Sequence, residues 1–485
     1  MSQDIQQTAQ HEHALKKELR LRDLVLMQIL LIMGISWTGI AAKQGPTHIW
    51  FWLFGMLLMF IPQAAVVAYC SRIWPLEGGV YQWTKFAHGP AAAFMGAWNF
   101  VIWALIAISN IGLYWASSLA YILGPNYAWM PDSHAFVGLL NFVLFGFILV
   151  VNIPGFHIGK WVSHFGSVMT VIIAALLTLL IFYHPAASAT HPHVSPQRPI
   201  SFAFPMSTML TLMSLNLFSK VCNSALSGLE QVAVFAGETK NPGRAIMRSA
   251  WFGAPLTAIL YLLMTCALLV YTPSQQVDLL APIPQVLAAA FTGGTGAGAA
   301  IGALLSKIAI FALALTVLAQ YSVLVAETAR LPLVAGWDNL VPAWFTKLHP
   351  KHRTPTRSIF VIVVAAVVIC TLATWGAGHE EAFQLMNGGA NTMYGIYYVM
   401  FFAVPLAAVF KHKLRDLPRP GVLLVLASIS GVIITVMGMV FAELPIVEVH
   451  SKLLFAIKVS SVSIAVNAIG AFFYWRGTRG QSAAA

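Results

Sequence analysis

Charged side chains are scarce in this chain of 485 residues. Asp, Glu, Lys and Arg make up 9% of the sequence, whereas an ordinary soluble domain carries about 25% of charged residues. Hydrophobic residues make up 59%. A chain with so few charges cannot cover a water-exposed surface, so the composition excludes a soluble globular protein.

Cysteines are also few, and a signal-peptide pattern is lacking. The four cysteines lie far apart within apolar stretches and without metal-ligand spacing. We therefore expect reduced packing residues, and neither a disulfide framework nor a metal site. Residues 1–22 are polar and contain no apolar core followed by a small-residue cleavage site, so we expect a short tail that is not removed.

Apolar segments, by contrast, recur along the whole chain. A membrane-spanning helix needs about 20 mostly apolar residues to cross about 30 Å of hydrocarbon. Twelve segments satisfy this requirement: 23–45, 49–71, 92–122, 134–153, 161–184, 208–237, 247–271, 298–329, 357–375, 381–410, 420–441 and 453–475. The sequence therefore predicts an all-α polytopic membrane protein with about twelve transmembrane helices.

The distribution of basic residues predicts the orientation of these segments. Cytoplasmic loops of membrane proteins are enriched in Lys and Arg. With the N-terminus inside, the loops predicted to face the cytoplasm hold most of the basic residues, whereas 272–297 holds none. We expect both termini in the cytoplasm of a cell-membrane protein. Topology and anionic membrane lipid then explain the net charge of +11 without a nucleic-acid partner.

Two of the predicted segments are interrupted near half depth. In the first, Gly34 and Gly39 bracket Ser-Trp-Thr, and in the sixth the residues 223–228 read Asn-Ser-Ala-Leu-Ser-Gly. Paired interruptions five segments apart indicate an inverted-repeat transporter, whose broken helices meet at the bilayer midplane. The alternative is that these small residues only allow close helix packing, but packing glycines usually lack such a concentration of Ser, Thr and Asn.

Three sequence motifs lie at the expected ends of these segments. They are AYCSRIWPLEGGVYQWTKFAHGPAAAFMGAW at Ala68–Trp98, Gly-Leu-Glu with Glu-Thr-Lys-Asn-Pro at 228–242, and ETARLPLVAGWDNLVPAWFTKLHPKHRTP at Glu327–Pro355. Together they resemble the amino acid-polyamine-organocation superfamily. The resemblance implies a leucine-transporter-like 5+5 inverted repeat with broken helices 1 and 6 at 23–410, two additional helices at 411–476, and cytoplasmic tails at 1–22 and 477–485.

The resemblance also implies a substrate site built mainly from backbone groups. Thr38 and Gly39 would offer amide N–H groups to a substrate carboxylate. Ile35, Ser224 and Ser227 would offer carbonyl groups to its amine, and Ala225 and Gly228 would leave room for the backbone to approach. Free N–H and C=O groups at broken helix ends suit this purpose because they carry the partial charges of the helix dipole.

Two further residues have alternative interpretations. Trp37 replaces the glycine that is usual in the first break of the family, and it either walls the pocket or faces lipid. Asn110 corresponds to the family's side-chain subsite, and it either reads a substrate side chain or binds a neighbouring helix.

Ionisable residues inside predicted spans are functional candidates, because burying them without a partner is unfavourable. Lys220 either approaches the pocket or extends to the outer interface, and Lys307 lies in the region where a coupling ion would bind. Glu230 matches the family's Gly-x-Glu position and is a candidate for gating or proton transfer. We expect Glu327 and Arg330 to pair as a cytoplasmic gate or loop brace.

Thr170 is a candidate for ion coupling. Some relatives carry a lysine at the corresponding place in the fifth segment, and alignment from Gly155 through Lys160 puts Thr170 there. With threonine in place of this lysine, the position has no amine to carry a proton. Sodium coupling, exchange, and proton transfer elsewhere remain as alternatives.

These features predict a secondary active transporter of amino acids, either an exchanger or an ion-coupled symporter using sodium or protons. An enzyme would need a convergent catalytic set, which the sequence lacks, and no cofactor is expected. Neutral amino acids are favoured because no acidic residue is predicted in the pocket. Cationic amino acids, polyamines or other small amines are the alternative, and a membrane nutrient sensor is the alternative from another class.

Overall fold

The computed structural model describes residues 2–12, 14–182, 199–204, 211–279, 281–291, 297–373, 379–411, 414, 418–445 and 451–482. Within these ranges the chain is helical and contains no β-strand. Leu19 and Thr239 form an isolated parallel β-bridge. The all-α prediction is confirmed.

Helices coincide with every apolar segment of the first half of the chain. After α1 (Ser2–Glu12), the first segment contains α2 (Leu21–Ile32) and α3 (Ile35–Ala42). The second contains α4 (His48–Gly55), η2 (Met56–Phe60) and α5 (Ile61–Ile73), and α6 (Val80–His88) follows as a loop helix. The third contains α7 (Pro90–Ile108) and α8 (Ile111–Leu123), and the next two are α9 (His134–Asn152) and α10 (Phe156–Phe182).

The second half begins with the other interrupted helix. It consists of α12 (Leu212–Lys220), the π-helical turn η4 (Val221–Ala225) and the 3₁₀ helix η5 (Gln231–Glu238). Then come α13 (Pro242–Tyr271), the short α14 (Pro282–Phe291), α15 (Ala297–Thr328), α16 (Arg330–Trp337), α17 (Thr356–Ala373), α18 (His379–Phe410), α19 (Val422–Ala442) and α20 (Lys452–Ser482).

In the described part of the chain, nine helical stretches are long and apolar enough to cross a membrane. The two interrupted helices and the shorter α17 fall outside that set. Large apolar side chains on the outer helices point away from the protein: Phe142 is 71% exposed, Phe182 79% and Leu423 83%. Such a surface suits lipid and not water. The four cysteines are unpaired and buried, in agreement with the prediction of packing residues.

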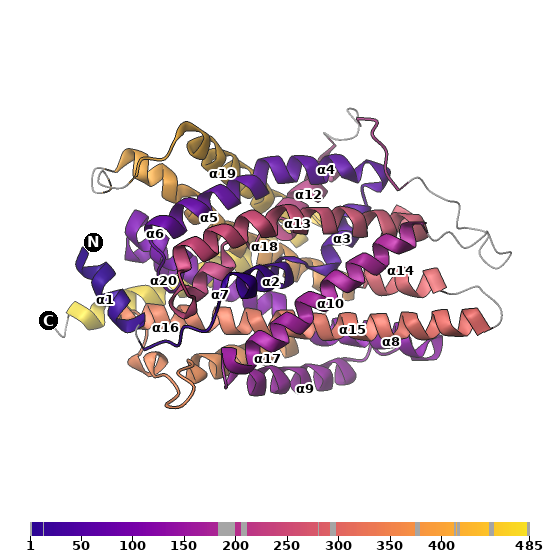
Figure 1. Cartoon of the computed structure of the whole chain (residues 1–485), viewed down its shortest axis with the longest axis horizontal. Helices are drawn as coiled ribbons and strands as arrows, with labels where there is room; N and C mark the ends of the chain where they lie inside the picture. Colours follow the sequence, from indigo (N-terminus) through magenta and orange to yellow (C-terminus); the bar gives the residue numbers. More distant parts are fainter. Residues whose placement is uncertain are drawn as a thin grey trace.

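Both termini lie at one end of the helical bundle (Figure 1). The helices run mostly along the long axis of the molecule, with α1, α6 and α16 near the termini and α14 toward the other end. We call the end that carries α1, α6 and α16 the terminal face. The two final membrane helices pack on the rest of the bundle, α19 mainly against α18 and α5, and α20 against α18 and α7.

Candidate substrate site

The first helix break lies at Met33 and Gly34, between α2 and α3. A tyrosine from α13 holds both sides of the break. The hydroxyl of Tyr261 donates a hydrogen bond to the Ile32 carbonyl at 2.6 Å and accepts one from the Gly34 N–H at 2.7 Å. These contacts pair backbone groups that the interruption removes from the helical ladder.

The second break lies between η4 and η5 and is held by side chains from three other helices. Gly228 has a φ of +105°, which glycine adopts without strain. Its N–H donates to the Tyr398 hydroxyl at 2.7 Å. The next N–H, of Leu229, donates to Gln63 Oε1 at 3.0 Å, and the Leu229 carbonyl accepts from Gln28 Nε2 at 2.8 Å. A π-helical turn directly before the break is typical of functional sites.

A cavity lies between the two breaks. Its lining includes Gly34 at the first break and Ser224 and Ser227 at the second. Helix α15 contributes Gln320 and Tyr321 to the lining. Every side chain that lines the cavity within the described residues is uncharged. The cavity therefore combines interrupted backbone with polar but neutral side chains.

Four of the predicted substrate residues line this cavity: Trp37, Asn110, Ser224 and Ser227. The indole of Trp37 lies back over Gly34, where any added Cβ would overlap it. This answers the open question about Trp37, which faces the cavity and not lipid. Asn110 lies at the junction of α7 and α8, and the Ser224 hydroxyl donates to Asn391 Oδ1 at 2.6 Å.

Of the other predicted substrate residues, Thr38, Gly39, Ala225 and Gly228 are not among the described residues that line the cavity. Thr38 and Ala225 are fully buried. Gly39 faces α14, since an added Cβ would lie 3.2 Å from Pro282. Gly228 contributes its N–H to Tyr398, and Ile35 is the first residue of α3, with a side chain outside the described part. Because the break lies at Gly34, Thr38 and Gly39 are already inside α3.

Two of the candidate ionisable residues lie away from the cavity. Lys220 is buried, and its Nζ donates to the carbonyls of Phe441 and Leu444, each at 3.3 Å. An ammonium suits this end of α19 because helix C-termini carry partial negative charge. Lys307 is exposed on the surface of α15.

Thr170 lies on the face of α10 that packs against α2 and α15. Its hydroxyl donates to the Gly166 carbonyl at 2.9 Å. Gly166, one turn earlier on the same face, lies against Leu30 of α2 and Ala319 of α15. Because Thr170 follows Gly166 by one helical turn, it lies near the first and eighth predicted segments.

Glu230 lies one layer behind the cavity. It is fully buried and accepts hydrogen bonds from the hydroxyls of Tyr394, at 3.0 Å, and Tyr398, at 2.6 Å. The ring of Tyr394 stacks on Trp103, with centroids 4.0 Å apart, and Trp103 lines the cavity. Aromatic residues therefore connect the carboxylate with the substrate cavity.

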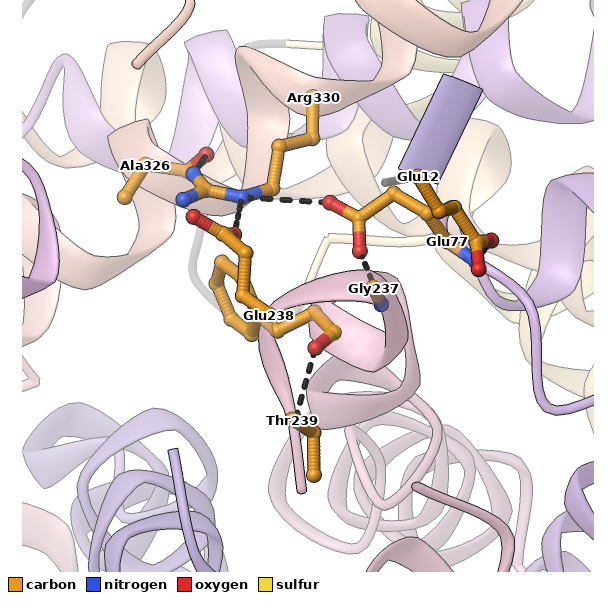
Figure 2. Close-up of polar contacts among 8 residues, drawn as sticks. Glu12, Glu77, Gly237, Glu238, Thr239, Ala326 and Arg330 are labelled. Carbon is orange, nitrogen blue, oxygen red and sulfur yellow. Dashed lines mark hydrogen bonds and ion pairs between the residues drawn. The ribbon is translucent and has the colours of Figure 1, made fainter. Parts of the chain in front are cut away.

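A buried ionic cluster lies at the terminal face (Figure 2). Nε of Arg330 lies 2.5 Å from Glu238 and 3.5 Å from Glu77. Glu77 also accepts from the Gly237 N–H at 2.6 Å. The predicted pair of Glu327 with Arg330 is wrong, because carboxylates from two other motif segments occupy the guanidinium.

The N-terminal segment joins this cluster. The Glu12 carboxylate accepts a hydrogen bond from the Glu77 N–H at 2.5 Å, and the backbone N–H groups of Glu18 and Leu19 donate to the Glu238 carbonyl. Burial raises the pKa of Glu12 to about 7, against the opposing effects of the Glu77 N–H and the Lys17 charge. The N-terminal segment is thus bound to this cluster and is not a free tail.

A second ion pair lies at the same face. Nζ of Lys85 lies 2.5 Å from Asp338, whose other carboxylate oxygen accepts from the Tyr81 hydroxyl at 2.7 Å. Lys85 and Tyr81 belong to the first motif segment, and Asp338 to the third. All three motif segments therefore contribute polar contacts that connect helices at the terminal face.

Sequence reasoning missed the side chains that hold the two breaks. Tyr261, Tyr398, Gln63 and Gln28 each lie inside an apolar segment, and each pairs with a residue at least 166 positions away. A polar side chain inside a membrane helix signals that it needs a partner. The signal does not say which partner, so the sequence alone could not have assigned these contacts.

Comparison with known proteins gives consistent matches over nearly the whole chain. The profile of a family described as amino acid permease matches residues 22–472. An uncharacterized transporter of Legionella pneumophila is 24% identical over 449 residues, covering 91% of this chain and 92% of that protein. The branched-chain amino acid permease BcaP of Bacillus subtilis is 25% identical over 445 residues, 87% of either chain.

The fold also has a match among solved structures. The crystal structure of MhsT in complex with L-phenylalanine has a TM-score of 0.62 at 11% identity, covering 87% of this chain and 98% of that chain. The match confirms the predicted fold class, and the profile confirms the resemblance inferred from the motifs. The chain belongs to the amino acid permease family, whose members are transporters and not enzymes.

Proposed function

We propose that this protein carries neutral amino acids across the cell membrane by alternating access. The observation that carries the proposal is the cavity between two broken helices, whose described lining has no charged side chain. A cationic side chain or a polyamine would need a carboxylate to replace its hydration. The name of BcaP, which refers to branched-chain amino acids, supports a neutral substrate.

The proposed binding mode uses the two breaks for the two charges of an amino acid. The carboxylate would lie at the start of α3, where N–H groups carry the positive end of the helix dipole. The amine would lie against carbonyls near Ser224 and Ser227. Ala225 and Gly228 would leave room for the backbone to approach the ligand, and Asn110 would contact its side chain.

The terminal face is proposed to be cytoplasmic. The loops rich in Lys and Arg that precede α13 and α17 are connected to helix ends near both termini (Figure 1). In this orientation the cluster around Arg330 is a closed inner gate. Transport would require the contacts of Arg330 with Glu77 and Glu238 to break and re-form in each cycle.

Of the four coupling candidates, Glu230 and Thr170 have positions that suit coupling. Glu230 is connected to the cavity through Tyr394, and Thr170 faces the first and eighth segments. Lys220 would act in gating only if its contacts with α19 change during the cycle. Lys307 is exposed on the surface of α15, away from the cavity. Coupling to sodium would require Thr170, and coupling to protons would require a buried carboxylate.

A thermal-shift screen followed by counterflow tests the proposal. Purified protein is heated with each of the common amino acids and with putrescine and spermidine, and ligands that raise the melting temperature are loaded into liposomes that contain the protein. We expect one or more neutral amino acids to stabilise the protein and to support uptake of the labelled ligand. Stabilisation by polyamines alone would overturn the assignment, and binding without counterflow would favour a membrane sensor.

A further inference from the structure

Glu327 is a buried carboxyl group without a partner. It is 0% exposed near the end of α15. Neither of its oxygens has a hydrogen-bond partner within the part of the chain that the structure describes. An ionised carboxylate in such a place is strongly unfavourable, because no protein donor replaces its lost solvation. The surroundings of Glu327 therefore suit the neutral acid, which carries a proton.

Arg330 lies three residues further along the chain, but its guanidinium already forms ion pairs with two other carboxylates. Its Nε pairs with Glu238 and Glu77, its Nη1 donates to the Ala326 carbonyl, and its guanidinium lies over the rings of two phenylalanines. Two carboxylates on one guanidinium leave no positive charge to balance a third. In this closed state Arg330 acts on Glu327 only through space, and the described residues contain no ion pair or hydrogen bond between the two.

Glu230, the other buried acid nearby, accepts hydrogen bonds from two tyrosine hydroxyls. The Tyr398 hydroxyl accepts hydrogen bonds from Gln63 Nε2 and from the Gly228 N–H, each at 2.7 Å. Both lone pairs of that oxygen are then occupied, so its one hydrogen is donated to Glu230. Tyr394 donates to the other Glu230 oxygen. These two hydroxyl donors stabilise the ionised form of Glu230, and Glu327 has no such donor among the described residues.

The other ionisable groups around Glu327 do not change this assignment. The charges of Glu230 and Arg330 act on Glu327, which in turn acts on two tyrosines of α18, Tyr394 and Tyr397. Asp23 of α2 and His164 of α10, helices that also pack on α15, pair with each other at 2.8 Å. Of the two buried acids, Glu230 is placed to be ionised and Glu327 to hold the proton.

We propose that Glu327 is the proton-binding residue of a proton-coupled transport cycle. The inference rests on the proposed function and adds the coupling ion to it. When the inner gate opens, Arg330 leaves Glu77 and Glu238, and water reaches Glu327. The O–H bond of the acid then breaks, the proton passes to cytoplasmic water, and the carboxylate pairs with Arg330. The inner gate then closes around this pair, and a proton taken up from the other side neutralises Glu327 and lets Arg330 return to Glu77 and Glu238.

Two assays on the full-length protein in liposomes separate coupling from transport. Counterflow of L-leucine, L-serine or L-phenylalanine without a pH gradient measures transport alone. Uptake driven by an acidic outer buffer, with a pH-sensitive dye trapped inside, measures coupling. We expect the wild type to accumulate substrate several-fold above the level without a gradient, with acidification of the lumen. Glu327→Gln should keep counterflow but lose both gradient-driven accumulation and the dye signal.

Two further variants control for folding and for general loss of charge. Glu327→Asp should restore part of the coupling, and Glu443→Gln, at the end of α19, should leave it unchanged. Wild-type counterflow together with uptake that ignores the pH gradient, or that responds to a sodium gradient instead, overturns the proton proposal and leaves the transport function in place. So does full coupling in Glu327→Gln. Absence of wild-type counterflow with every amino acid overturns the proposed function itself.

Discussion

Tyr261→Phe should weaken substrate binding through the first helix break. The variant removes the hydroxyl that contacts the Ile32 carbonyl and the Gly34 N–H, and it keeps the ring, which stacks on Trp52 at 5.0 Å. An unpaired buried backbone group costs about 1–3 kcal/mol. Gly34 keeps a second acceptor, the Ile32 carbonyl at 2.7 Å, which reduces the loss.

We therefore expect Tyr261→Phe to destabilise the broken conformation of the first helix by an amount near the lower end of that range. Hydrogen bonds inside membranes contribute about 1–2 kcal/mol, and a loss of that size lowers affinity about 5-fold to 30-fold. Tyr271→Phe, on the same helix, is the matched control, because its hydroxyl donates to the Leu180 carbonyl away from the break. Affinity is measured by ligand-induced thermal shift at graded ligand concentration. Equal affinity in the two variants would refute the role of Tyr261.

Three other predictions concern the second break, the N-terminal segment and the topology. Gly228→Ala should abolish substrate binding in an assembled protein, because φ there is +105°, whereas Gly389→Ala, where an added Cβ meets nothing within 4 Å, should bind normally. Docking of the N-terminal segment should be strongest below the ordinary Glu12 pKa of 4.5 and weaken as the pH rises through about 7, since the docked carboxyl holds its proton longer. Proteolysis of that segment should accelerate over this range in the wild type and become independent of pH in Glu12→Gln. An impermeant thiol reagent should label Gln285→Cys from outside and Arg244→Cys only from inside, and the reverse pattern would invert the topology.

The helices and their two breaks could be predicted because both depend on local composition. Apolar runs set the spans, and the polar residues near Gly34 and Gly228 mark where the helical ladder is interrupted. The position of the first break within its segment depends on a partner from α13, Tyr261, that local composition does not reveal. This is why Thr38 and Gly39 lie inside α3 and not at its open end.

The partners of buried charges were the least predictable feature. Glu327 and Arg330 are close in sequence, which favoured a local pair. In the folded chain, Glu77 from the loop before α6 and Glu238 from the end of η5 pair with the guanidinium instead. Only the three-dimensional arrangement shows that Glu327 is left without a donor.

The site between the two breaks can be tested by protecting a cysteine with substrate. Ser224→Cys introduces a thiol into the cavity lining, and the native cysteines give little background because all are buried. The rate of its reaction with a small methanethiosulfonate is measured with and without a neutral amino acid that stabilises the protein, with Ser274→Cys in η6 (Ser274–Gln276) as the control outside the cavity. We predict that the amino acid slows modification of residue 224 several-fold and leaves that of residue 274 unchanged. An unchanged rate at residue 224 at a saturating ligand concentration would contradict binding between the broken helices.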